Sequence, residues 1–223
     1  MILIPARNEG PRIGAVIRSV RLAQPGVEIV VIANDCTDDT VSVAEQAGAT
    51  VIGSDRGYGR ALCAGYRYAI SKPSVPWVVQ LDGDGQHPSE AIPRLVEALG
   101  RADLVIGSRF ASGGSACAWP RRRRWTVQLM GKATEWMSGL RVQDISSGFQ
   151  ALNISVVAAI VNDFPVDLTD ANLLVRIQRM GFSVTEIGVK MASRAGGESM
   201  HGGLRSAIYA GKTLMAVSQE IRR

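Results

Sequence analysis

The sequence has few cysteines, few aromatic residues and no long hydrophobic run. Its three cysteines, Cys36, Cys63 and Cys117, are an odd number without CxxC spacing, which argues against a disulfide framework and a cysteine metal site. No stretch approaches the length of a membrane span, and Met1 leads directly into ILIP without the basic segment of a secretory signal. We therefore expect a cytoplasmic protein in a reducing environment.

The composition is that of a globular protein with an excess of positive charge. The 223 residues are 46% hydrophobic, which suits one domain, residues 1–223, with a substantial core. The net charge of +5 favours an anionic ligand without naming it. Aromatic residues make up only 5% of the chain and part of the basic excess lies in one arginine run, so we expect no nucleic-acid partner.

Short apolar runs alternate with helix-compatible stretches over the first half of the chain. The runs are nearly continuous in apolar character, which is typical of parallel strands buried on both faces. The expected strands are residues 2–4, 28–33, 50–53, 77–81 and 103–107, and the expected helices are 11–23, 38–47, 59–72 and 89–99. After residue 107 the alternation ends: 108–124 reads as a loop and 125–139 as an amphipathic helix. The pattern predicts an α/β, Rossmann-like domain with a mostly parallel central sheet flanked by helices.

Two acids stand immediately after the fourth apolar run, in VVQLDGDGQHP. If the strand continues, the side chains of Asp82 and Asp84 point the same way, because strand side chains alternate with a period of two. Such oxygen ligands suit Mg²⁺ or Mn²⁺, which keep waters and accept phosphate oxygens as further ligands. The alternative is a turn with solvated acids, and His87 beside them is interpreted as structural.

Five segments, each following an expected strand, resemble in order those of inverting family-2 glycosyltransferases of the GT-A fold. They are PARNEG, VVIANDCTDDT, DRGYGRALCAGYRYA, VVQLDGDGQHPSEAIPRLVEAL and DLVIGSRFASGG. The similarity extends through VQDISSGFQAL and SRAGGESMHGG, and it is greatest to polyprenyl- and dolichyl-phosphate sugar transferases. It implies a nucleotide-sugar-binding part in residues 1–107, an acceptor-side part in 108–223, and a nucleoside diphosphate sugar as donor.

The resemblance also implies roles for the donor-side residues. The metal, Mg²⁺ or Mn²⁺, is assigned to Asp82, Asp84 and Gln86, with Asp84 also counted as catalytic. The donor-binding residues are Pro5, Ala6, Arg7, Glu9, Asn34, Asp35, Arg60, Asp82, Gly83, Arg194, Ser199 and His201. The chain departs from the family pattern where Ala33 replaces an acid, Tyr58 occupies the usual lysine position with Arg60 near it, and Met200 replaces a lysine, which leaves the base and the acceptor open.

On the acceptor side the resemblance assigns Arg109, Arg123, Arg124, Ser147 and Gln150, with Arg109 and Asp144 counted as catalytic. The run Arg121–Arg124 is expected to contact an acceptor phosphate or anionic lipid headgroups rather than solvent alone, and Trp119 and Trp125 suit a membrane interface. The expected acceptor is polyprenyl phosphate, with the protein peripheral at the inner face of the membrane. Two alternatives stay open: a soluble hydroxyl acceptor, for which Asp144 is the candidate general base, and a non-catalytic basic module that binds membranes or nucleic acid.

Overall fold

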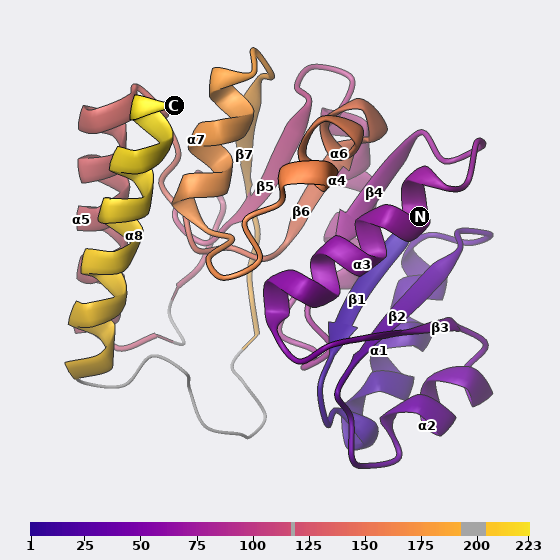
Figure 1. Ribbon diagram of the computed structural model, residues 1–223. Coiled ribbons are helices and arrows are strands. Elements are labelled where there is room, and N and C mark those ends of the chain that lie inside the picture. The colour runs from indigo at the N-terminus through magenta and orange to yellow at the C-terminus, as the bar shows by residue number, and fades with distance from the viewer. Residues whose placement is uncertain (117–118, 193–203) are drawn as a thin grey trace.

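A computed structural model describes residues 1–116, 119–192 and 204–223, with the side chains of 204–209 excepted. Seven strands form one sheet, and helices cover both of its faces (Figure 1). Strands from the first and second halves of the chain belong to this same sheet.

The first half alternates strands with helices, as predicted. Its elements are β1 (Ile2–Ala6), α1 (Gly10–Ala23), β2 (Ile29–Asn34), α2 (Thr40–Gln46), β3 (Thr50–Ser54), α3 (Tyr58–Ile70), β4 (Trp77–Gln80), η1 (Ser89–Ala91), α4 (Ile92–Ala98) and β5 (Leu104–Ser108). All five expected strands and all four expected helices are present, with bounds shifted by at most a few residues.

The second half contains one expected helix and several elements that were not expected. Its elements are α5 (Arg121–Ser138), β6 (Gln150–Asn153), α6 (Ile154–Ile160), η2 (Val161–Asp163), α7 (Ala171–Arg179), β7 (Val184–Gly188) and α8 (Leu204–Arg222). The expectation that the loop continues to residue 124 was wrong, because the arginine run forms the first turn of α5 directly after Pro120. Arginine has a high helix propensity, so the run lengthens the helix rather than preceding it.

The strand order is β3-β2-β1-β4-β6-β5-β7. β6 is antiparallel to both β4 and β5, and the other neighbouring strands are parallel. β1 lies between β2 and β4, so the strand order changes direction there. In open α/β sheets a crevice forms beyond the carboxyl ends of the strands at such a point. The segment with Asp82 and Asp84 follows β4 at this place.

Alternate residues of each central strand enter two different cores. Ile2 and Ile4 of β1 face α1, α2 and α4, whereas Leu3 faces the side covered by α3, α6 and α7. This explains why the strands read as continuous apolar runs, since both of their faces are buried.

Helices α5 and α8 lie side by side at one edge of the molecule (Figure 1). Val217 of α8 and Met130 of α5 are buried in the same core as α7. Within the described part of the chain, no helix is long and apolar enough to cross a membrane.

Candidate active site

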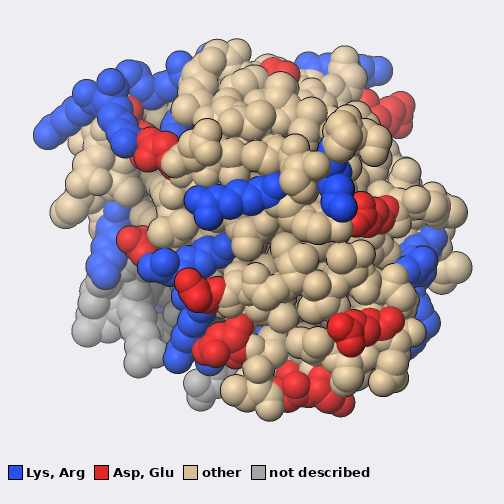
Figure 2. Space-filling model, turned by 45° about the vertical axis from the view of Figure 1, so that its right-hand side comes forward, with Lys and Arg blue, Asp and Glu red and all other residues tan. Residues whose placement is uncertain are grey.

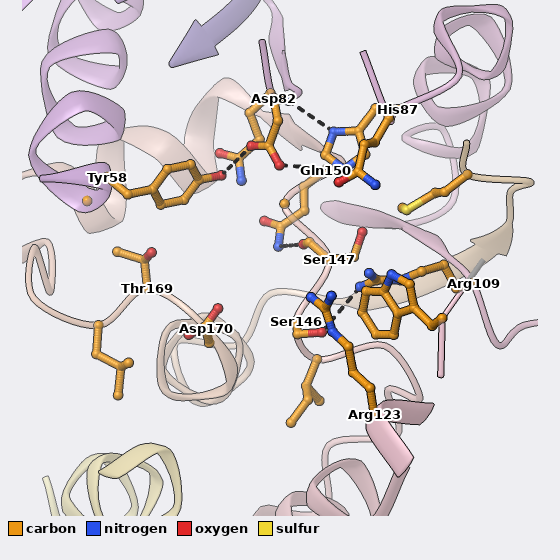
Figure 3. A pocket seen from close by; sticks show the side chains of 18 of the residues that line it. Tyr58, Asp82, His87, Arg109, Arg123, Ser146, Ser147, Gln150, Thr169 and Asp170 are labelled. Carbon is orange, nitrogen blue, oxygen red and sulfur yellow. Dashed lines mark hydrogen bonds and ion pairs between the residues drawn. The ribbon is translucent and has the colours of Figure 1, made fainter. Parts of the chain in front are cut away.

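A pocket of about 710 Å³ lies beyond the carboxyl ends of the strands (Figure 3). Its walls come from the first turn of α3, the segment after β4, residues 115–116 and 119–123, the segment 145–150, and residues 166–170 before α7. Its volume is within the range of sites that bind small molecules and cofactors. The pocket therefore combines segments from both halves of the chain.

Asp82 presents its carboxylate to one wall of the pocket. Its side chain is 38% exposed, and Oδ1 accepts a hydrogen bond of 3.3 Å from the hydroxyl of Tyr58. Behind it, Nδ1 of His87 accepts a hydrogen bond of 3.0 Å from the backbone N–H of Asp82. The His87 ring is buried and stacks on Phe149. Burial lowers the pKa of His87, which favours the neutral ring that this hydrogen bond requires, so His87 holds the backbone at Asp82.

The other two predicted metal ligands lie on the turn after Asp82. Gln86 lines the pocket, and its Nε2 donates to the carbonyl of Ala192 at 3.2 Å. Asp84 is buried, outside the set of described residues that line the pocket, and its Oδ1 accepts from the backbone N–H of Gln86 at 3.0 Å. Asp82 and Gln86 thus face the pocket directly, while Asp84 holds the turn between them.

The donor set of this turn fits a hard divalent cation that keeps part of its coordination for other ligands. Among the described residues no three His, Cys, Asp or Glu side chains come close enough to enclose an ion. The Asp82 carboxylate and the Gln86 amide group face the pocket, and the buried Asp84 carboxylate would join them only after turning toward it. Such a set leaves positions for waters and phosphate oxygens, which is how Mg²⁺ is usually bound. Space for them depends on Gly148, because a Cβ there would lie 2.8 Å from the Tyr58 hydroxyl and 3.5 Å from Asp82 Oδ1.

Across the pocket, Arg109 forms a bidentate ion pair with Asp144. The guanidinium Nε and Nη2 of Arg109 donate to the two Asp144 oxygens, each at 2.7 Å, and the Arg109 backbone N–H donates to Oδ2 at 2.9 Å. Asp144 is fully buried, and Arg109 lines the pocket. The structure does not support the hypothesis that Asp144 acts as a general base, because Arg109 occupies both of its oxygens and separates it from the pocket. Asp144 instead orients Arg109.

Trp119 lies between two guanidinium groups. Arg109 is 3.7 Å from the Trp119 ring centroid and Arg123 is 3.8 Å from it, both within the range of cation–π contacts. All three side chains line the pocket, and Figure 3 labels Arg109 and Arg123 there. Trp119 therefore packs against two arginines of the pocket wall, and its expected place at a membrane interface stays a prediction. Arg124, in contrast to Arg123, is not among the described residues that form the pocket wall.

Ser147 and Gln150 line the pocket as well. The Ser147 hydroxyl donates to the carbonyl of Gly107 at 2.6 Å, and Gln150 Nε2 donates to the Ser147 carbonyl at 2.8 Å. Gln150 Oε1 is buried and has no hydrogen-bond partner among the described residues. Both side chains thus stabilise this part of the pocket wall.

The predicted donor residues divide into two groups. Arg60 lines the pocket. Asn34 touches it indirectly, since its Oδ1 accepts a hydrogen bond of 2.9 Å from the backbone N–H of the pocket residue Gly57. This bond connects the end of β2 to the pocket wall.

The remaining predicted donor residues are not among the described residues that line the pocket. Some of them lie at the ends of β1 and β2 or after β4, and three lie in a segment that the structure does not describe. Pro5 and Ala6 are buried at the end of β1, Arg7 and Asp35 are exposed, Glu9 pairs with Arg12, and Gly83 packs against Ala6 and Glu9. Arg194, Ser199 and His201 lie outside the described residues.

Sequence reasoning missed the wall formed by residues 166–170. Asp170 lies there at the start of α7, and burial raises its pKa to about 7. Its only signal in the sequence is an acid placed before a helix, which usually marks an N-cap. In the structure the Asp170 side chain makes no capping hydrogen bond.

Comparisons with known proteins agree with this geometry. The sequence pattern described as glycosyl transferase family 2 matches residues 1–161. The undecaprenyl-phosphate mannosyltransferase of Micrococcus luteus is 31% identical over 223 residues, covering 92% of this chain and 88% of that protein. The polyprenol monophosphomannose synthase of Mycolicibacterium smegmatis is 28% identical, covering 94% and 84%.

Solved structures show the same arrangement of the chain. The glucosyl-3-phosphoglycerate synthase of Mycobacterium tuberculosis, in complex with Mn²⁺, UDP and glucosyl-3-phosphoglycerate, has a TM-score of 0.70 at 20% identity. The match covers 98% of this chain and 78% of that one. This likeness shows the GT-A fold. The match over residues 1–161 shows that the chain belongs to glycosyl transferase family 2.

Proposed function

We propose that this protein transfers a sugar, with inversion, from a nucleoside diphosphate sugar to a polyprenyl phosphate. The observation that carries the proposal is a single pocket with Asp82 on one wall and the guanidiniums of Arg109 and Arg123 on another. A carboxylate suits the metal that accompanies a diphosphate, and paired arginines suit a second phosphate. The relatives named as undecaprenyl-phosphate and polyprenol transferases support the choice of acceptor.

On the donor side, Asp82, Gln86 and Asp84 would hold the divalent cation. When bound, this cation neutralises negative charge on the leaving diphosphate. Tyr58 and His87 keep Asp82 in place through its side chain and its backbone. Arg56 and Arg60, which line the pocket near α3, add positive charge for the diphosphate.

On the acceptor side, Arg109 and Arg123 would bind the phosphate of the lipid. Trp119 keeps the two guanidiniums on either side of one ring, and Asp144 fixes the orientation of Arg109. An acceptor phosphate is already anionic, so the reaction needs positioning rather than a general base. One phosphate oxygen forms the new bond to the anomeric carbon, the bond from that carbon to the diphosphate breaks, and the nucleoside diphosphate leaves with the electron pair.

Replacing Arg123 tests the acceptor site. We expect Arg123→Gln to raise the KM for polyprenyl phosphate by roughly tenfold or more, because a hydrogen bond to a charged group contributes about 1.5–3 kcal/mol. The affinity for a nucleoside diphosphate with Mn²⁺ should not change. The assay is run in uncharged detergent micelles, and Arg122→Gln, at the exposed neighbouring position of α5, is the matched control. If Arg123→Gln and Arg122→Gln have the same KM, the acceptor assignment is wrong.

A hydroxyl acceptor is a second candidate, and Asp170 is the observation that favours it. A hydroxyl nucleophile requires a base, and a carboxylate with a pKa of about 7 in the pocket wall is suited to that task. Under this alternative, Asp170→Asn abolishes transfer to a soluble alcohol. Under the lipid-phosphate proposal, Asp170→Asn retains most of the transfer to polyprenyl phosphate.

A further inference from the structure

Helix α5 has two faces of opposite character. Met130 and Thr134 are buried, and Val127 and Met137 pack against the core. Arg123, on this inner side, reaches the pocket. The other face carries exposed residues at positions 121, 125, 129, 132 and 136, whose spacing of three or four residues places them in one stripe along the helix.

This stripe is both apolar and basic. Its exposed fractions are 75% for Trp125, 69% for Leu129 and 89% for Trp136, although such side chains are usually buried at least in part. We define the α5 outer face as these three residues together with the exposed Arg121, Arg122 and Lys132. The 18 residues of α5 make the helix about 27 Å long, so the face extends over most of one side of it.

We propose that the α5 outer face binds the surface of an anionic lipid bilayer. Tryptophan is enriched at the boundary between lipid and water, and a helix with apolar and basic residues on one face lies in that boundary. Each basic residue near an anionic membrane contributes about 1 kcal/mol. The single acid of α5, Glu135, lies beside the face and pairs with Arg141 at 3.7 Å.

A second copy of the chain fits this face less well than a membrane does. Two such faces packed together would bring arginines and lysines of like charge into one interface, whereas an anionic surface complements them. On the face drawn in Figure 2, blue and red side chains are interspersed, and acids predominate along its lower edge. Among the described residues, both exposed tryptophans lie on α5, on the same face as Arg121, Arg122 and Lys132.

The position of the face also suits the proposed reaction. The purpose of the face rests on that proposed function, whereas the observations on its residues do not. Arg123 in the pocket and Trp125 on the outer face are two residues apart in the same helix. These two residues point to opposite sides of the helix, so a bilayer against Trp125 would lie one helix diameter, roughly 10 Å, from the acceptor wall of the pocket. The face would thus keep the acceptor side of the protein near the membrane surface, where a lipid phosphate is found.

Vesicle co-sedimentation without donor or acceptor tests this inference. We expect the protein to bind vesicles of phosphatidylcholine mixed with phosphatidylglycerol, and Trp125→Gln/Trp136→Gln to weaken this binding by at least about tenfold through loss of apolar burial. Arg121→Gln/Arg122→Gln should weaken it by roughly thirtyfold and reduce the preference over pure phosphatidylcholine, with Lys132 still in place. The matched control is Leu22→Gln/Ile70→Gln, which removes two exposed apolar residues from α1 and α3 and should bind as the unaltered protein does.

Three results would overturn the inference. The first is that the unaltered protein does not bind anionic vesicles, and the second is that the double tryptophan variant binds them as well as the control does. The third is that light scattering shows the unaltered protein and the control to be dimers and the tryptophan variant to be a monomer, while none of them binds vesicles. Failure of the proposed function is seen separately, as the absence of glycolipid product from the unaltered protein in detergent micelles.

Discussion

Asp170 is a pocket residue for which the structure predicts a marked dependence of stability on pH. Its pKa rises from 3.8 to about 7 because burial disfavours the charged carboxylate. Between these two values the unfolded chain binds fewer protons at this site than the folded protein does. The contribution of Asp170 to the free energy of unfolding therefore falls as the pH rises from about 4 to about 7, and it stays low above that.

Replacing Asp170 by asparagine should remove this dependence. We expect Asp170→Asn to be more stable than the unaltered protein at about pH 8, by at most about 4 kcal/mol, and less where pocket water reaches the carboxylate. The difference should shrink toward pH 4. Urea unfolding of both proteins across this range measures it, with Asp167→Asn, an exposed neighbour, as control. A stability difference that does not vary with pH would show that Asp170 titrates normally.

At the residue scale, the sequence was informative where a motif follows a strand. Asp82, Gln86 and Arg109 follow predicted strands, and all three line the pocket. The sequence could not show that Asp144 is buried beneath Arg109, because that pairing joins residues 35 positions apart. It could not show Asp170 either, since its raised pKa depends on desolvation by the folded wall rather than on its neighbours in sequence.

At the element scale, the close contact between α3 and residues 166–169 shapes the pocket. A Cβ at Gly59 would lie 2.3 Å from the carbonyl oxygen of Val166 and 2.8 Å from Cγ2 of Thr169. Only glycine permits this approach, so the first turn of α3 and the segment before α7 can form one continuous wall.

An alanine at position 59 should therefore destabilise the protein. We expect Gly59→Ala to lower the free energy of unfolding by about 1–3 kcal/mol, because the overlap with a backbone oxygen outweighs the better helix propensity of alanine. The matched control is Gly211→Ala in α8, where nothing lies within 4 Å and the same change should stabilise by up to about 1 kcal/mol. Urea denaturation measures the free energy of unfolding of both variants. A Gly59→Ala protein as stable as Gly211→Ala would contradict the predicted clash.

The elements themselves were predictable to different degrees. β1 to β5 are buried on both faces or coincide with clear apolar runs of the sequence, so the apolar pattern and the turn residues between the runs were sufficient to find them. β6 has only four residues and pairs antiparallel between two strands that precede it in the chain, and β7 is only partly buried over most of its length. Short strands of this kind depend on tertiary pairing more than on local sequence.

At the scale of the whole molecule, the proposed chemistry depends on bringing the two halves of the chain together. The carboxylate wall follows β4, whereas the arginine wall follows β5 and begins α5, and both open into one pocket. We propose that residues 1–223 act as a single domain, since the strands of both halves alternate in one sheet. On this account, donor and acceptor phosphates meet between the walls, and α5 places that meeting point at a membrane.

The most direct test is transfer of a labelled sugar to polyprenyl phosphate in detergent micelles with Mn²⁺. The donors to compare are GDP-mannose, UDP-glucose and UDP-N-acetylglucosamine. We predict that the unaltered protein forms labelled lipid from at least one donor and that this product requires the metal. The product should be absent with Asp82→Asn and present with the control Glu97→Gln, which removes an exposed acid of α4. Labelled lipid formed equally well by Asp82→Asn, or no labelled lipid from any donor by a folded protein that binds the nucleoside diphosphate, would contradict the account.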